Sequence, residues 1–197
     1  MIIFAIVLAG GQGARMGGAD KALLTLAGRP LIDHVITRIA PQVAKVIISA
    51  NGNPARFHAS GLQVLADEEP MGPLSGILSG LREAAAAGAD ALLSVPVDAP
   101  FPPADLAAKL QSVWPQPGFA RAGGRDHSAT ALWPVTLADP LASFLASGAK
   151  AKIADFAALH GAQPVEFSRE GDFLNLNRPE DLAEAEKLAE AVSRGEA

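Results

Sequence analysis

The sequence contains no cysteine, and it is poor in charged residues, which make up 19% of its 197 positions. Without cysteine there are no disulfides, thiolate metal sites or cysteine nucleophiles. The low charge is accompanied by 49% apolar residues, a composition that excludes an intrinsically disordered chain. The net charge of −5 disfavours a protein that holds nucleic acid on a general basic surface, because its field repels phosphate. Any phosphate must therefore be bound at a local site.

The sequence also lacks an unbroken apolar run of the roughly 18 residues that a membrane span needs. The apolar N-terminal stretch, MIIFAIVLAGG, has no basic residue before it, and glycines follow at the place where a signal-peptide cleavage site would lie. We interpret this stretch as a buried strand. The expected protein is soluble and cytoplasmic, with no membrane and no nucleic acid among its partners.

Short apolar runs alternate with longer segments of helical spacing, as in an α/β protein. Because these runs are apolar throughout, they predict strands covered on both faces, in a mostly parallel sheet. A chain of this length without a linker is expected to be one domain, residues 1–197, built as a three-layer α/β sandwich. The predicted strands are 2–8, 46–49, 63–66 and 91–95, with shorter ones near 119, at 129–133 and near 165. The predicted helices are 31–39, 74–87, 102–111, 137–146, 153–159 and 179–192.

A glycine-rich loop follows the first predicted strand and reads LAGGQGARMGGADK from Leu8 to Lys21. In an open α/β sheet, ligands bind at the carboxyl ends of the strands, where this loop lies. Its glycines let main-chain N–H groups approach an anion closely, and Arg15 and Lys21 add positive charge. The letters match neither the dinucleotide-binding pattern nor the Walker pattern. The loop is therefore predicted to bind phosphate in another way, with a tight turn and solvated charges as the structural alternative.

Two carboxylates follow predicted strands in the same manner. Asp98 comes after the strand 91–95, and a single carboxylate with triphosphate oxygens and waters is a suitable environment for Mg²⁺. Without the neighbouring loop, Asp98 would be interpreted as a turn residue before Pro100. Asp67 follows the strand 63–66. From the residues alone, Asp67 with Glu68 and Glu69 is more commonly a solvated end of a strand than a binding site.

The glycine loop resembles the signature L-A-G-G-x-x-x-R-M-G-x-D-K of the molybdenum cofactor guanylyltransferases, a nucleotidyltransferase family. Further blocks agree in order and extend the resemblance over nearly the whole chain: Asp67, GPLSG at 72–76, VDAP at 97–100, RDH at 125–127 with TAL at 130–132, and NLNRPE at 175–180. One position departs from the family, because Ser49 stands where relatives carry Asn, with Asn51 two residues on. The resemblance implies a Rossmann-like nucleotidyltransferase fold.

The resemblance also implies a reaction, in which GMP passes from GTP to the terminal phosphate of molybdenum-molybdopterin and pyrophosphate is released. Such a protein positions and neutralises phosphates rather than supplying a nucleophile, and the motifs G-x-S-x-G and H-E-x-x-H are indeed absent. The implied cofactor is Mg²⁺ on Asp98, and the implied catalytic residues are Arg15, Lys21 and Asp98. The implied GTP-binding residues are Leu8, Ala9, Gly10, Gly11, Lys21, Ser49, Asn51, Asp67 and Asp98. The carboxylate of Asp67 can accept hydrogen bonds from a guanine base or from ribose hydroxyls, and the sequence leaves both open.

The first half of the chain is expected to bind GTP and magnesium, and the second half the pterin cofactor. The resemblance assigns pterin contacts to Gly76, His127, Asn175 and Asn177. From the residues alone, His127, between a glycine turn and a strand, is more commonly structural. Asn175 and Asn177 alternate along FLNLN and would share one face of a short strand, with a turn into the last helix as the alternative. Either Lys150 or Lys152 is a candidate contact for the pterin phosphate.

Other functions are open on the sequence alone. A molybdenum cofactor cytidylyltransferase would share the fold, metal and reaction, although those relatives typically show Leu-Ala-Ala-Gly where this chain has LAGG at 8–11. A sugar-nucleotide pyrophosphorylase, a non-catalytic carrier of nucleotide and cofactor, and a dinucleotide-dependent oxidoreductase are weaker alternatives. Transient contact with cofactor-synthesis proteins or molybdoenzyme maturation factors is a further expectation. Trp114 and Trp133 are predicted to fill the core rather than to stack on a pterin.

Overall fold

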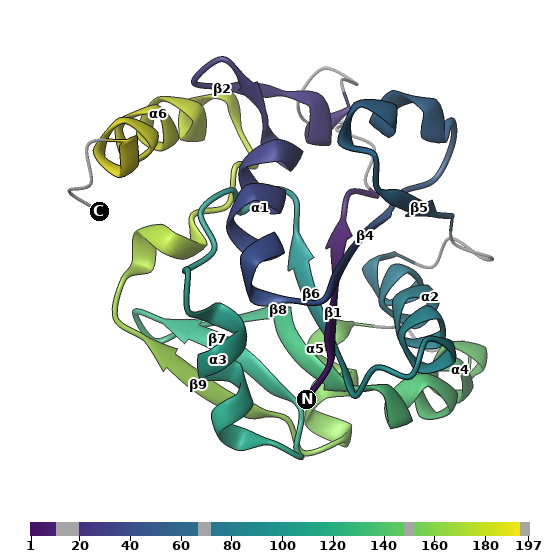
Figure 1. The fold of residues 1–197 in the computed structure, drawn as a ribbon. Coiled ribbons are helices and arrows are strands. Elements are labelled where there is room, and N and C mark those ends of the chain that lie inside the picture. The colour runs from purple at the N-terminus through teal and green to yellow at the C-terminus, as the bar shows by residue number, and fades with distance from the viewer. Residues whose placement is uncertain (11–19, 67–71, 148–151, 194–197) are drawn as a thin grey trace.

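The computed structural model describes residues 1–10, 20–66, 72–147 and 152–193 (Figure 1). Within these residues, seven strands form one sheet in the order β5-β4-β1-β6-β8-β7-β9. They are β1 (Ile3–Leu8), β4 (Lys45–Ser49), β5 (Gln63–Leu65), β6 (Ala91–Pro96), β7 (Gly118–Ala122), β8 (Arg125–Pro134) and β9 (Gln163–Phe167). Only β8 is antiparallel to its neighbours in this sheet, so the prediction of a mostly parallel sheet is confirmed.

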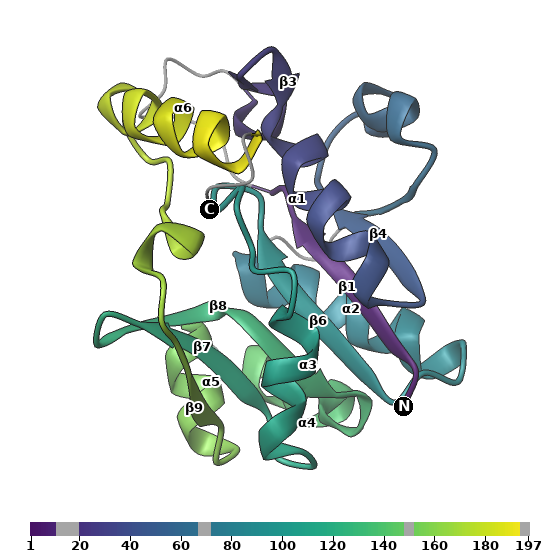
Figure 2. The same cartoon turned by 60° about the vertical axis from the view of Figure 1, so that its left-hand side comes forward.

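Helices cover both faces of the sheet, which gives the predicted three layers (Figures 1 and 2). On one face lie α1 (Leu31–Ile39) and α3 (Leu106–Leu110), and on the other α2 (Pro73–Ala86), α4 (Ala138–Ala146) and α5 (Ile153–Leu159). Helix α6 (Pro179–Ser193) lies beyond the end of the sheet, and its Ala185 and Ala189 belong to the same core as α1 and α3 (Figures 1 and 2). Strand β1 shows why its sequence is apolar throughout. Ile3, Ala5 and Val7 pack with the first set of helices, and the alternate residues 4, 6 and 8 pack with the second. Among the described residues, no helix is long and apolar enough to cross a membrane.

The strap, residues 174–177, departs from the sequence prediction. The prediction of a strand there is wrong. The 3-10 helix Glu170–Phe173 precedes the strap, and the strap itself is extended chain that pairs with no strand of the described residues. The strap leads from β9 to α6, which lies beside the two-stranded hairpin of β2 (Thr25–Leu26) and β3 (Arg29–Pro30) in both views (Figures 1 and 2). This hairpin was not expected from the sequence, because two-residue strands are too short to show a period. Its turn residues, Ala27 and Gly28, both have positive φ, as type I′ turns require.

Smaller corrections concern the starts of two other elements. Helix α3 begins at Leu106 rather than at the predicted Pro102. Pro103 disfavours helical conformation at the residue before it, which is Pro102. His127 lies inside β8 rather than before it, since the strand begins at Arg125.

The two tryptophans have different environments. Trp133 is fully buried and its indole N–H donates to Ser94 Oγ at 2.9 Å, which confirms its predicted place in the core. The prediction for Trp114 is wrong: this side chain is 37% exposed, in the turn that follows the 3-10 helix Gln111–Val113.

Candidate active site

The carboxyl ends of β1, β4 and β6 meet at one edge of the sheet. In the parallel register Leu8 is opposite both Ser49 and Pro96. The main chain stays paired just beyond the strands, where Ala9 N–H donates to Ser49 O at 2.9 Å and Val97 N–H donates to Leu8 O at 3.2 Å. The loops that leave these strands carry the candidate nucleotide residues, so the sequence correctly predicted that they share an edge.

Lys21 follows the glycine loop and is placed by its neighbour Asp20. The carboxylate of Asp20 caps the 3-10 helix Lys21–Leu23 by accepting from Ala22 N–H at 3.1 Å. It also forms an ion pair with Arg56, whose Nε lies 2.6 Å from Asp20 Oδ2. Arg56 in turn donates to Asn53 O at 3.0 Å. The loop after β4 is thereby tied to the segment that presents Lys21.

The ammonium of Lys21 joins parts of the chain that are distant in sequence. It lies 2.8 Å from Asp98 Oδ2 and 2.8 Å from Asn177 Oδ1. The side chains of Lys21 and Asp98 are 18% and 25% exposed, so a ligand can reach both. The strap is fixed to the same place, since Leu176 N–H donates to the main-chain oxygen of Asp98 at 2.8 Å. Three predicted site residues thus come together here.

The environment of Asp98 fits a magnesium ion that is held mainly by a bound ligand. No group of three or more acidic or histidine side chains with metal-binding geometry occurs among the described residues. A single carboxylate is nevertheless what Mg²⁺ commonly takes from a protein when phosphate oxygens and waters complete its shell. The Lys21 ammonium already places a positive group 2.8 Å from this carboxylate. Asp98 is therefore suited to contribute one ligand.

The remaining predicted GTP residues, and the predicted catalytic residue Arg15, differ in their surroundings. Leu8 and Ala9 are buried, so only their main chain is available to a ligand, whereas Gly10 and Asn51 are exposed. Among the described residues beyond its chain neighbours, no atom lies within 4 Å of where a Cβ of Gly10 would be. Gly11, Arg15 and Asp67 lie outside the described residues.

Ser49 and Gly76 pack against each other beneath this edge. Ser49 is 3% exposed. A Cβ on Gly76 would lie 2.3 Å from Ser49 Oγ and 3.1 Å from Leu8 Cδ2, so glycine allows α2 to approach the ends of β1 and β4 closely. The structure shows a packing role for both residues, and their ligand contacts stay predictions.

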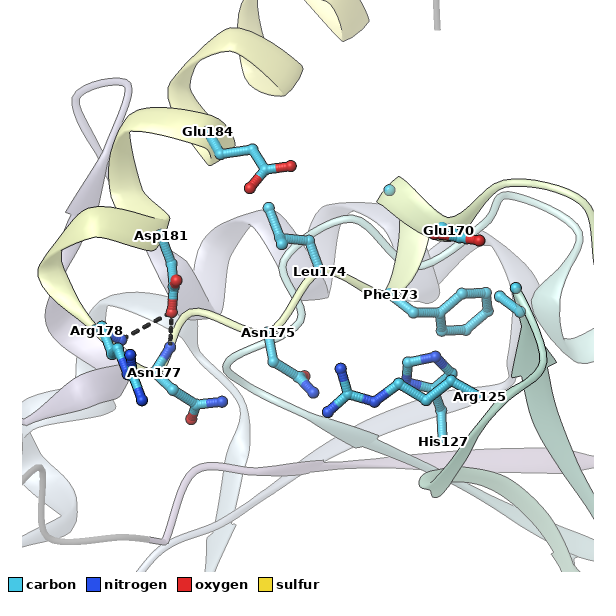
Figure 3. Close-up of a pocket in the computed structure, with 13 residues that line it drawn as sticks. Arg125, His127, Glu170, Phe173, Leu174, Asn175, Asn177, Arg178, Asp181 and Glu184 are labelled. Carbon is cyan, nitrogen blue, oxygen red and sulfur yellow. Dashed lines mark hydrogen bonds between the residues drawn. The ribbon is translucent and has the colours of Figure 1, made fainter.

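A pocket of about 600 Å³ lies beside the Lys21 contact, between the β7–β8 hairpin, the strap and the start of α6 (Figure 3). Its lining residues are Ala122, Gly123, Arg125, His127, Glu170, Gly171, Phe173, Leu174, Asn175, Asn177, Arg178, Asp181 and Glu184. Three of the four predicted pterin contacts, His127, Asn175 and Asn177, are among them. Lys152 is exposed and precedes α5 without lining this pocket, and Lys150 is outside the described residues.

His127 forms an aromatic wall of the pocket with Phe173. The two rings stack with centroids 4.8 Å apart and an interplanar angle of 26° (Figure 3). Burial lowers the pKa of His127, the positive charge of Arg125 lowers it further, and Asp126 opposes the shift. The neutral imidazole is therefore favoured, and a neutral ring offers one donor and one acceptor nitrogen.

Asp181 fixes the main chain at the end of the strap. Its Oδ2 accepts from the N–H groups of Asn177 and Arg178 at 2.7 and 2.8 Å, and these bonds lower its pKa (Figure 3). Asp181 is the third residue of α6, the position from which an acidic side chain commonly reaches back to the residues before a helix. Its spacing from Arg178 is thus a signal that the sequence analysis missed.

Phe173, Arg125 and Arg178 were also not predicted as site residues. Arg125 belongs to the RDH block and its side chain points toward Asn175 in Figure 3, so the motif contained a usable signal. Phe173 had none, because its contact with His127 arises from two distant segments.

Comparison with known proteins agrees with this geometry. Residues 5–162 match the MobA-like NTP transferase domain. A molybdenum cofactor guanylyltransferase from Cereibacter sphaeroides is 58% identical over 189 residues, covering 95% of this chain and 97% of the relative. The chain belongs to the MobA-like NTP transferase family. A second family member, a molybdenum cofactor guanylyltransferase from Acidiphilium cryptum, is 48% identical and covers 92% of this chain and 93% of its own.

A solved structure has the same fold as this chain. Molybdopterin-guanine dinucleotide biosynthesis protein A from Archaeoglobus fulgidus superposes with a TM-score of 0.74 at 21% identity, covering 96% of this chain and 99% of the other. The predicted nucleotidyltransferase fold is therefore confirmed.

Proposed function

We propose that this protein is a molybdenum cofactor guanylyltransferase, which transfers GMP from GTP to the terminal phosphate of molybdenum-molybdopterin and releases pyrophosphate. The observation that carries the proposal is the contact of Lys21 with Asp98 at the carboxyl ends of β1 and β6, beside a separate pocket. It occurs in a chain 58% identical to a protein of that name. One domain would hold GTP on its N-terminal half and the pterin on its C-terminal half.

On the nucleotide side, Lys21 would neutralise the triphosphate, and the exposed main chain at Gly10 would donate to phosphate oxygens. Asp98 would hold Mg²⁺, which when bound spreads the charge of the phosphates. Gly11, Arg15 and Asp67 are proposed to act in the same site, as are Ser49 and Asn51 through the loop after β4. None of these groups needs to become covalently bonded to the nucleotide, because the attacking oxygen belongs to the second substrate.

On the pterin side, the pocket of about 600 Å³ has a suitable size for a drug-sized ligand. The stacked rings of His127 and Phe173 present an aromatic wall against which a planar pterin can pack. Asn175 and Asn177 offer carboxamides that both donate and accept hydrogen bonds, as the edge of a pterin requires. A cytoplasmic location and transient contact with cofactor-synthesis or maturation proteins are part of the same proposal.

The first test is thermal unfolding of the purified protein with Mg²⁺ and GTP, CTP, ATP or UTP in turn. A ligand at about 100 times its Kd stabilises by roughly 2.7 kcal/mol, which is readily measured. We expect stabilisation by GTP alone, and its loss in Asp98→Ala. The second test is anaerobic incubation with molybdenum-molybdopterin and analysis of the product for GMP. Stabilisation by CTP with cytidylyl transfer would replace the proposal by the cytidylyltransferase alternative, and nucleotide binding without transfer would favour a carrier.

A further inference from the structure

The Lys21 ammonium touches both halves of the proposed site at once. Asp98 lies on the nucleotide side, at the end of β6. Asn177 also contacts this ammonium and belongs to the lining of the neighbouring pocket. A single hydrogen bond between Lys21 and Asn177 therefore connects the proposed triphosphate residue to the proposed pterin pocket.

The Asn177 end of this bond is held firmly. Its main-chain N–H donates to Asp181 Oδ2 at 2.7 Å, and the preceding residue, Leu176, is fully buried and bonded to the main-chain oxygen of Asp98. The Lys21 end, in contrast, is a flexible four-carbon stem with a partly exposed ammonium. If Lys21 moves, the main chain of the strap does not follow it. The contact is then broken rather than stretched.

A bound nucleotide competes with this resting arrangement. An ammonium has three N–H donors, and two of them are already used by Asp98 and Asn177. A triphosphate attracts the ammonium, and a cation bound with the nucleotide attracts the carboxylate of Asp98. Both attractions draw Lys21 away from the contacts that it makes in the ligand-free protein, so nucleotide binding weakens its bond to Asn177.

We propose that Asn177 couples the two substrate subsites through Lys21. In the ligand-free protein its carboxamide oxygen retains Lys21, and nucleotide binding releases this oxygen to the pterin pocket. Because such coupling is reciprocal, each substrate raises the affinity of the other, and GTP prepares the pocket for the pterin. This inference rests on the proposed function, since it requires that Mg²⁺·GTP binds at Lys21.

The test is isothermal titration calorimetry with GTP at saturating Mg²⁺, on the wild type, Asn177→Ala, Lys21→Ala and the double variant. Asn177→Ala removes the oxygen that competes for Lys21, so its Kd for GTP should be roughly fivefold lower than that of the wild type. Losing a buried hydrogen bond to a charged group would change the Kd roughly tenfold or more, and the effect is smaller here because Asn177 is exposed. In the Lys21→Ala background the same substitution should have no effect. Asn175→Ala is the matched control: it removes a carboxamide from the same pocket and should leave the Kd for GTP unchanged.

The outcomes separate this inference from the function on which it rests. If the wild type binds Mg²⁺·GTP but Asn177→Ala binds it equally or more weakly, Asn177 supports Lys21 or is irrelevant to it, and the coupling is refuted while the proposed function stands. If no variant binds Mg²⁺·GTP, both are refuted. Should Asn177→Ala fail to fold by circular dichroism, Asn177→Leu, which is similar in size and has no hydrogen-bond acceptor in its side chain, takes its place with the same expected gain.

Discussion

Replacing Gly76 with alanine tests how closely α2 packs on the sheet edge that carries the proposed nucleotide site. A Cβ there would lie 2.3 Å from Ser49 Oγ, 3.0 Å from Ser49 Cβ and 3.1 Å from Leu8 Cδ2. Since a Cβ cannot move without its main chain, helix or strand must shift, and overpacking of this kind costs about 1–3 kcal/mol. The higher helix propensity of alanine offsets about 1 kcal/mol. A contact as short as 2.3 Å belongs to the upper part of the overpacking range, about 2–3 kcal/mol, so we expect the free energy of unfolding to fall by about 1–2 kcal/mol.

Urea denaturation of the ligand-free protein, followed by circular dichroism, measures this loss. Adding Ser49→Ala removes the closest atom, so the double variant should be more stable than the sum of the single changes by at least about 0.5 kcal/mol. Gly80→Ala is the control on the same helix: its closest contacts, at 2.8 Å, are the terminal carbons Ile6 Cδ1 and Leu92 Cδ2, which can move, so it should lose less. Wild-type stability in Gly76→Ala, or additive changes in the cycle, would refute the reasoning.

Four other substitutions test the chemistry, the core and the pH dependence of stability. Asp98→Ala should abolish stabilisation by Mg²⁺·GTP in thermal unfolding. The ligand-free variant should lose only about 1 kcal/mol of stability, because the ion pair of Asp98 with Lys21 is partly exposed. An unchanged response to GTP would contradict the assignment of the metal to Asp98. Trp133→Phe should lose about 2–4 kcal/mol in urea, through a lost hydrogen bond and a cavity, whereas exposed Trp114→Phe should lose almost none. Because burial holds the His127 pKa below its ordinary 6.5, the unfolded chain takes up the proton first. The free energy of unfolding should therefore decline as the pH falls below about 6.5, and His127→Asn should flatten that decline. Parallel pH profiles of stability for the wild type and His127→Asn would exclude this role of His127.

The strands were predictable because a strand covered on both faces must be apolar at every position. All six residues of β1, IFAIVL, are buried, and each of them is apolar. The shared edge of Lys21 and Asp98 was predictable for a related reason, since the carboxyl ends of neighbouring parallel strands coincide. Both conclusions depend on local sequence and on one general rule of topology.

The strap could not be predicted in this way. Its FLNLN pattern alternates like a strand, but its main chain is bonded to the Asp98 oxygen and to the Asp181 side chain. Lys21 and Asn177, which contact each other, are 156 residues apart in the sequence. No local period encodes a contact over that distance. The family motif indicated that Asn177 matters, and the structure adds that it faces the nucleotide side as well as the pocket.

The reversed direction of β8 brings the pocket residue His127 to the same sheet edge as Asp98, as the two proposed subsites require. Strand β8 is antiparallel to β6, pairing Ala91 with Pro134 and Ser94 with Ala131, so its first residues extend toward the carboxyl end of β6. His127 therefore reaches the ligand edge from the start of a strand, whereas Asp98 reaches it from the end of one. In a wholly parallel sheet, position 127 would lie at the opposite edge, away from Lys21. The same reversal leaves room between the β7–β8 hairpin and α6, and the strap that crosses this room places Asn177 between the two subsites.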